Sequence, residues 1–177
     1  MAKVSKISRI LRVDSVRLEL ETPEKYRRII EVAPAGEERD IPPIRERREK
    51  LIQELVGLLE PTGLIQHRGR LTFDLICRER RTGTGIGHGI AVPHVRSKHI
   101  RDVAIGFGRT SYPVDWDAAD GGDVDLFFVM AAPPYDDTLY NRLWKKLAEL
   151  LRFPEVRGGL REAEEPGEVI GILSRFE

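Results

Sequence analysis

The residues best suited to chemistry lie between positions 78 and 96, where a glycine-rich turn leads into a histidine. Glycines occupy every second position of the turn, at Gly83, Gly85, Gly87 and Gly89. Glycine permits positive φ and close backbone approach, so such a turn can aim several N–H groups at an anion such as phosphate. Pro93 fixes its own φ and favours an extended residue before it, so His94 follows a stiff, strand-like lead. A histidine held in this way is suited to attack phosphorus.

Phosphoryl transfer to His94 would place specific demands on its surroundings. The attacking nitrogen must be unprotonated, and a histidine with an ordinary pKa of about 6.5 is mostly neutral at cytoplasmic pH. The phosphoryl oxygens need alignment and neutralisation more than covalent help. Arg78 and Arg96 could supply charge and bidentate contacts, and Thr84 and the N–H groups of residues 83–89 could supply neutral donors. This scheme requires no metal and no other cofactor.

Other kinds of site fit the same residues less well. The alternating glycines match neither G-x-G-x-x-G nor a Walker motif, so a dinucleotide site is not expected. His88, His94 and His99 have five and four residues between them, which is no standard zinc spacing. Arg78 could instead be a helix C-terminal cap, and Arg96 a solvated surface charge.

The segment resembles the active-site signature of the fructose/mannitol/nitrogen-type (type-2) enzyme IIA domains of the bacterial phosphoenolpyruvate-dependent phosphotransferase system. The segments in register with that signature are 78–79, 83–87 and 89–94, followed by Arg96. His88 departs from it, because the family usually has asparagine there. The resemblance continues from Asp123 to the C-terminus and weakens before about residue 45. It implies that His94 is the phosphoacceptor, that a histidine phosphocarrier protein (HPr-like) loads it, and that a IIB protein or a regulated partner follows.

A second departure falls at Tyr140. Members of the family often carry a second active-site histidine at the start of the helix after the central strand. The downstream residues 147–151 set the register, which places Tyr140 at that position. A tyrosine hydroxyl can donate a hydrogen bond but carries no positive charge at neutral pH. On register alone, Tyr140 is a candidate pocket residue.

The elements that must position these residues alternate between strands and helices. Strand patterns occupy residues 16–20, 103–108 and 124–130, and the last is apolar enough to be central. Helical patterns occupy residues 44–60, 71–81, 136–152 and 168–176. We therefore predict an α/β fold. The resemblance implies the same kind of fold, a mixed, mainly parallel sheet flanked by helices on both faces in an α/β/α sandwich.

Residues 21–45 have the least defined pattern. Residues 21–25 could form a turn and 28–32 an alternating strand, which would add a hairpin before a polar loop. The family has a shorter link here, so we interpret about 20 of these residues as an insertion in a single domain spanning 1–177. We expect a structural appendage, with a partner-specific surface as the alternative.

Composition predicts a soluble cytoplasmic protein. The 29 basic and 29 acidic residues cancel, so no net field draws the chain to nucleic acid or to a membrane. The longest apolar stretch, residues 124–134, is about half a membrane span, and no signal peptide is evident. The single cysteine, Cys77, excludes an internal disulfide and fits a buried small hydrophobe better than a reactive thiol.

Three classes of function follow from the sequence. The first is a phosphoryl relay in which His94 receives phosphate from the histidine carrier protein and passes it to a IIB cysteine. The second is a nitrogen-type regulatory protein whose phosphorylation state controls a partner without sugar transport. The third is a degenerate domain that binds partners without turnover. The tyrosine at position 140, and the lack of a fused IIB or IIC segment in this chain, slightly favour regulation.

Overall fold

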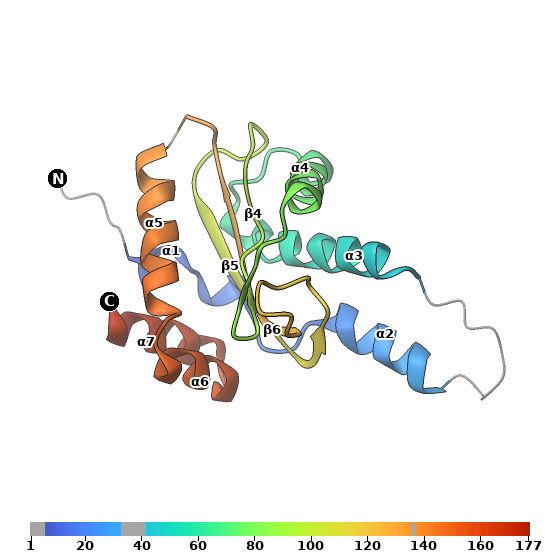
Figure 1. Ribbon diagram of the computed structural model, residues 1–177. Coiled ribbons are helices and arrows are strands. Elements are labelled where there is room, and N and C mark those ends of the chain that lie inside the picture. The colour runs from blue at the N-terminus through green and yellow to red at the C-terminus, as the bar shows by residue number, and fades with distance from the viewer. Residues whose placement is uncertain (1–5, 33–41, 136) are drawn as a thin grey trace.

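The computed structural model describes residues 6–32, 42–135 and 137–177, and within them the chain forms a six-stranded mixed sheet (Figure 1). The strands are β1 (Val16–Arg17), β2 (Gly85–Gly87), β3 (Ile90–Ala91), β4 (His94–Arg96), β5 (Ala104–Val114) and β6 (Val124–Ala132). Their order is β1-β5-β6-β3-β2, with β4 paired to β6 as well. Strands β1 and β5, β3 and β6, and β4 and β6 pair in parallel. The longest pairing, between β5 and β6, is antiparallel.

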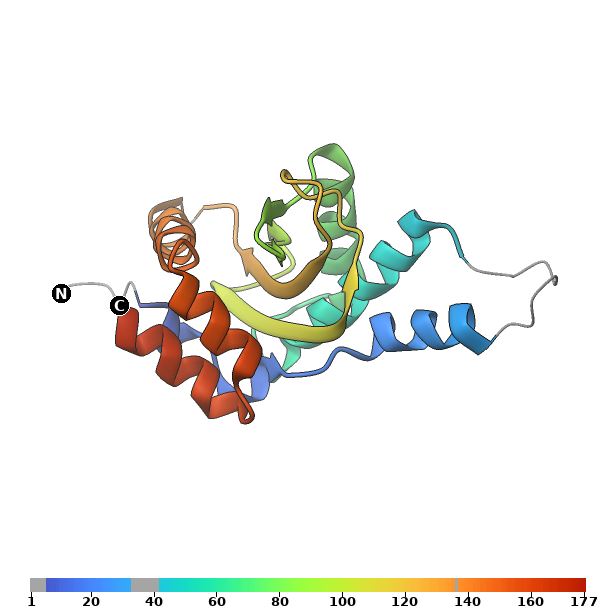
Figure 2. The same cartoon turned by 60° about the horizontal axis from the view of Figure 1, so that its bottom comes forward.

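Helices cover both faces of this sheet (Figures 1 and 2). On one face lie α3 (Ile44–Gly57) and α4 (Arg68–Arg81). On the other lie α1 (Ile7–Ile10), α5 (Asp137–Leu150), α6 (Pro154–Glu162) and α7 (Pro166–Phe176). Short 3-10 turns occur at Val13–Ser15 and Glu60–Thr62. Among the described residues, no helix combines the length and apolarity needed to cross a membrane.

Strand β6 explains why the sheet is covered on both sides. Its side chains alternate between two buried clusters: Leu126, Phe128 and Met130 belong to the cluster under α5 to α7, and Phe127, Val129 and Ala131 to the cluster under α3 and α4. Because successive side chains of a strand point to opposite faces, a continuous apolar run requires cover on both. The predicted α/β/α architecture and the central position of this strand are confirmed.

The helix before the glycine turn also forms as predicted. Helix α4 buries Leu71, Thr72, Leu75 and Ile76, which recur at the spacing of one helical face. It begins three residues earlier than the pattern indicated and ends at Arg81, so it delivers Arg78 to its C-terminal end. Strand β2 lies within the glycine-rich segment and forms an antiparallel pair with β3. Strands β3 and β4 then follow one another along the same edge of β6.

The prediction for residues 21–32 was wrong. They form helix α2 (Glu21–Val32), not a turn followed by a strand, so the chain has no hairpin there. Pro23 suits the first turn of a helix, and the alternation at 28–32 is too short to outweigh the helical pattern around it. Most of the predicted polar loop lies outside the described residues, and the interpretation of 21–45 as an insertion stays a prediction.

Two smaller corrections concern the ends of the chain. The first strand spans only Val16–Arg17, although the N–H of Leu20 still donates to the carbonyl of Arg109. The short helix α1 and the helix α6 were not predicted. Helix α6 contains two consecutive glycines, which weaken its helical pattern in the sequence.

Candidate active site

His94 is the first residue of β4, and its backbone surroundings determine which ring nitrogen can react. The Nδ1 atom lies 2.6 Å from the carbonyl oxygen of Val92. Because a carbonyl can only accept a hydrogen bond, this contact assigns the ring proton to Nδ1. The lone pair of the neutral ring then lies on Nε2.

The other ring nitrogen faces an arginine. Nη2 of Arg78 lies 3.3 Å from Nε2 of His94, and Nη1 of Arg78 donates to the carbonyl of Thr82 at 3.0 Å. A guanidinium has only donors, so this contact agrees with a lone pair on Nε2. Burial first, and then the charge of Arg78, lower the pKa of His94, while the Val92 carbonyl acts in the opposite direction. The ring is therefore held neutral and nucleophilic at neutral pH.

Helix α5 supplies the opposite wall. The ring of Tyr140 lies 6.4 Å from that of His94, and the ring of Trp144 lies 4.6 Å away at an interplanar angle of 32°. The guanidinium of Arg96 lies 4.9 Å above the Tyr140 ring, and its Nη2 donates to Oδ1 of Asn141 at 3.0 Å. Burial raises the pKa of Tyr140 to about 12, so its hydroxyl keeps its proton at neutral pH.

Four of the five candidate residues named from the sequence line one open depression of about 780 Å³: Arg78, His94, Arg96 and Tyr140. Arg81 and Lys98 add two further cations, and Asp74 is the one carboxylate among the described residues that line it. The balance favours an anion such as a phosphoryl group. Cys77, which was expected to be buried, is half-buried and lines the same depression.

Thr84 is placed differently. Its side chain is buried, and its hydroxyl and N–H donate to the two carboxylate oxygens of Glu79 at 2.6 and 2.8 Å. Nε1 of Trp116 donates to the Thr84 hydroxyl oxygen at 3.3 Å. The donors of Thr84 are therefore directed at Glu79 and not into the depression beside His94, contrary to the role expected of them.

Thr84 instead belongs to a set of contacts that supports the histidine. Its carbonyl accepts the N–H of Val92 at 3.0 Å, and the carbonyl of Val92 in turn accepts Nδ1 of His94. Glu79 is partly buried, and this burial raises the pKa of its carboxyl group despite the three donors around it. Sequence reasoning assigned Glu79 no role, although it lies within the matched signature next to Arg78. Trp144 was also missed, and its only signal was the four-residue spacing from Tyr140.

At His88 the glycine turn contacts side chains of the protein itself, and the expectation that its N–H groups converge on an anion stays a prediction. The N–H of His88 donates to Oδ2 of Asp120 at 2.8 Å, and the carbonyl of His88 accepts Nη2 of Arg161 at 2.7 Å. A Cβ on Gly89 would lie 2.5 Å from both Arg161 and Asp125. The glycines allow the β2–β3 pair to pack closely against its neighbours, and this packing brings β3 and then His94 to the edge of β6.

No group of three or more histidine, cysteine, aspartate or glutamate side chains among the described residues could hold a metal ion. His99 is buried and its ring meets that of His67 edge to face, with the centroids 5.6 Å apart. His88 lies on the turn with φ of 57°.

Comparison with known proteins identifies relatives over most of the chain. The model of the family described as "Phosphoenolpyruvate-dependent sugar phosphotransferase system, EIIA 2" matches residues 41–176. The chain is 32% identical over 132 residues to the PTS system fructose-specific EIIABC component of Bacillus subtilis. This match covers 75% of this chain but only 21% of that relative. It is 33% identical over 116 residues to a nitrogen regulatory protein of Pseudomonas aeruginosa, covering 65% of this chain and 75% of the relative.

Solved structures show the same fold. The nitrogen regulatory protein IIA-Ntr from Neisseria meningitidis superposes with a TM-score of 0.73 at 26% identity, covering 94% of this chain and 98% of the other. The IIA mannitol protein from Escherichia coli has a TM-score of 0.66 at 17% identity, covering 92% and 97%. At that identity the second likeness concerns the fold alone.

Proposed function

This chain belongs to the EIIA 2 family of the phosphoenolpyruvate-dependent sugar phosphotransferase system, and we propose that it carries a phosphoryl group on Nε2 of His94. The observation that carries the proposal is the unequal environment of the two ring nitrogens. Nδ1 donates its hydrogen bond to the carbonyl of Val92, while Nε2 faces Arg78 in a cationic depression. That arrangement presents a neutral nucleophile to an incoming phosphoryl group.

In the loading step, the lone pair of Nε2 attacks the phosphorus of a phosphohistidine on an HPr-like carrier. The new N–P bond forms as the donor's N–P bond breaks, and the electron pair of that bond returns to the donor imidazole. The His94 ring then carries a positive charge, which the Val92 carbonyl stabilises at Nδ1–H. Arg78 and Arg96 neutralise the phosphoryl oxygens, and the Tyr140 hydroxyl offers a neutral donor.

In the unloading step, a cysteine thiolate of a IIB protein attacks the same phosphorus. The P–S bond forms as the P–N bond breaks, and the neutral His94 ring is restored. Enzyme IIA mannitol from Escherichia coli has a related fold, and its structure has been solved in complex with phosphorylated enzyme IIB mannitol. We place this relay in the cytoplasm, where phosphoenolpyruvate is made.

The alternative recipient is a regulated partner. The nitrogen regulatory relatives favour it, because this chain covers 75% of the Pseudomonas aeruginosa protein and 98% of the Neisseria meningitidis chain. Both alternatives use the phosphohistidine at position 94 and differ in the recipient, a IIB cysteine for sugar transport or a binding partner for regulation.

Incubation with phosphoenolpyruvate, enzyme I and an HPr-like protein tests the shared step. We expect one phosphate per chain, labile in acid and stable in alkali as phosphoramidates are, and no label on His94→Ala. A label that survives acid would indicate a hydroxyl ester and contradict the proposal. Mixing the labelled chain with a IIB protein then separates the alternatives, because loss of label to a IIB cysteine supports transport.

A further inference from the structure

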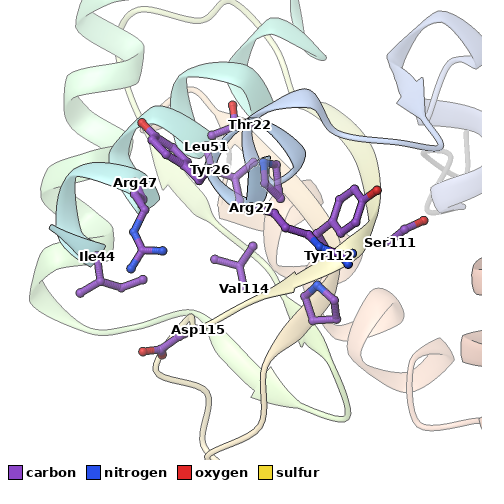
Figure 3. Close-up of a pocket in the computed structure, with 12 residues that line it drawn as sticks. Thr22, Tyr26, Arg27, Ile44, Arg47, Leu51, Ser111, Tyr112, Val114 and Asp115 are labelled. Atoms are coloured by element: carbon purple, nitrogen blue, oxygen red, sulfur yellow. The ribbon is translucent and has the colours of Figure 1, made fainter. Parts of the chain in front are cut away.

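We propose that a cavity between α2, α3 and the end of β5, separate from the depression at His94, binds a small organic anion with a flat apolar body (Figure 3). The cavity has a volume of about 460 Å³, which is within the range of small-molecule sites. None of its lining residues lines the depression at His94. The residues that carry the argument are Tyr26, Arg27, Ile44, Arg47, Tyr112 and Val114.

Arg47 is the reason to expect an anion. Its Nε atom is buried and has no hydrogen-bond partner among residues 6–32, 42–135 and 137–177. A buried donor on a permanently charged group is costly without an acceptor, and an anion bound in the cavity beside this guanidinium would offset its charge. The guanidinium fork matches the geometry of a carboxylate or a phosphate. In Figure 3 this side chain extends from α3 beside Ile44, with Val114 across from it.

The other walls indicate a flat apolar body. Tyr26 and Tyr112 contribute aromatic rings, and Ile44, Leu51 and Val114 contribute aliphatic side chains. The Tyr112 ring already carries a guanidinium on one face, since the Cζ atom of Arg27 lies 4.4 Å from its centroid. Rings and guanidinium planes of this kind stack on planar groups.

Among the described residues that line the cavity, the one carboxylate is already paired. Asp115 lines the cavity, but its carboxylate is paired with Nη2 of Arg48 at 2.8 Å. Burial, and then the charge of Glu46, raise the pKa of Tyr26, so its hydroxyl is a neutral donor. None of the lining residues that the structure describes accepts a hydrogen bond from Nε of Arg47, so this guanidinium is the group that favours an anion.

An NMR titration of the full, isotope-labelled chain tests this site, with benzoate, phenyl phosphate, inorganic phosphate and benzyl alcohol as probes. We expect benzoate or phenyl phosphate to shift the amide signals of Tyr26, Arg47, Tyr112 and Val114 saturably. Inorganic phosphate lacks the flat body and benzyl alcohol lacks the charge, so both should bind at least tenfold more weakly. The tighter of the two aromatic anions identifies the anionic group.

Matched variants complete the test. Arg47→Met should weaken binding at least tenfold, and Arg47→Lys should also weaken it because a lysine keeps the charge without the fork. Arg45→Met is the control, because Arg45 lies on the same helix, contacts Glu49 and does not line this cavity. His94→Ala should bind as the parent does, which makes this site independent of the proposed phosphorylation. Unchanged affinity in folded Arg47→Met, or shifts confined to the residues around His94, would overturn the proposal.

Discussion

At the scale of single residues, the two nitrogens of His94 have different partners and therefore different tasks. The proton on Nδ1 is held by a backbone carbonyl, which cannot be removed by any side-chain substitution. Nε2 faces the guanidinium of Arg78, which can be removed without touching the ring. The tautomer and the electrostatics of the proposed phosphoacceptor can thus be tested separately.

The first prediction concerns pH. Burial and Arg78 lower the pKa of His94, so its folded value lies below the unfolded value of about 6.5. Between these two pKa values the unfolded chain binds the proton more readily than the folded chain does. The free energy of unfolding therefore falls as the pH drops from about 6.5 through the folded pKa. His94→Gln should flatten this part of the curve. Urea unfolding at a series of pH values measures the stability, and an NMR titration measures the pKa of the His94 ring. A ring pKa at or above about 6.5 would contradict the assignment.

The second prediction concerns Arg78. Arg78→Ala should slow phosphorylation by roughly 10²-fold or more, the scale of losing one charge-stabilising donor in a transition state. Arg96→Ala should cost less, because that guanidinium is directed toward Tyr140 and Asn141. Arg80→Ala is the matched control, since Arg80 lies two residues away and pairs with Glu49. Initial labelling rates measure all three, and equal, negligible effects would mean that neither Arg78 nor Arg96 holds the oxygens.

The third prediction concerns Tyr140. Tyr140→Phe removes one neutral hydroxyl and should weaken transfer by ~1 kcal/mol, the size of one neutral hydrogen bond. Tyr140→His introduces an imidazole beside His94, so the labelling rate should vary more with pH between about 6 and 8. Rates measured across that range decide the matter. Two variants indistinguishable from the parent would show that Tyr140 takes no part in the reaction.

At the scale of elements, the glycine turn acts through packing. A Cβ on Gly85 would lie 2.7 Å from Cα of Ala118, a backbone atom that cannot move aside easily. The β2–β3 pair can therefore approach the segment after β5 only because this position lacks a side chain. That approach also places the hydroxyl of Thr84 where it accepts a hydrogen bond from the indole N–H of Trp116.

The fourth prediction follows from this contact. Gly85→Ala should lower the free energy of unfolding by about 1 to 3 kcal/mol, the usual cost of overpacking. Gly83→Ala is the control, because the nearest atom to its new Cβ would be the carbonyl oxygen of Asp117 at an ordinary 3.5 Å. Urea unfolding compares the two, and equal stabilities would contradict the packing role of Gly85.

At the scale of the whole molecule, Arg109 connects parts that lie far apart in the chain. From β5 its guanidinium donates to the carbonyls of Leu160, Arg161 and Ala163 at the end of α6, and to the carbonyl of Leu18. It thereby joins the N-terminal strand region and the C-terminal helices to the sheet. Several backbone acceptors depend on this one half-buried cation.

The fifth prediction tests that connection. Arg109→Met should lower the free energy of unfolding by about 2 to 4 kcal/mol, because several carbonyls lose a charged donor at once. Arg70→Met should change it little, since Arg70 is exposed on α4. Thermal and urea unfolding provide the comparison, and a loss no greater than that of the control would show that water replaces the guanidinium at these carbonyls.

Local pattern in the sequence was enough to predict several features of this protein. The apolar run at 124–130 required a strand buried on both faces, and the spacing in 71–81 required a helix that ends near Arg78. The contiguous signature named His94 and its neighbours and led to the family that the comparisons show. These features need only a few adjacent residues to be recognised.

The three-dimensional structure added the features that depend on residues meeting across the fold. It assigned the free nitrogen of His94 through Val92 and Arg78, and it brought Trp144 against the ring. It also turned Thr84 toward Glu79, and in the described part of the chain it left Nε of Arg47 without a hydrogen-bond partner beside a cavity between three elements. Periodicity reports which face of an element is buried, but the partner of each side chain is set by the packing of elements that lie far apart in the sequence.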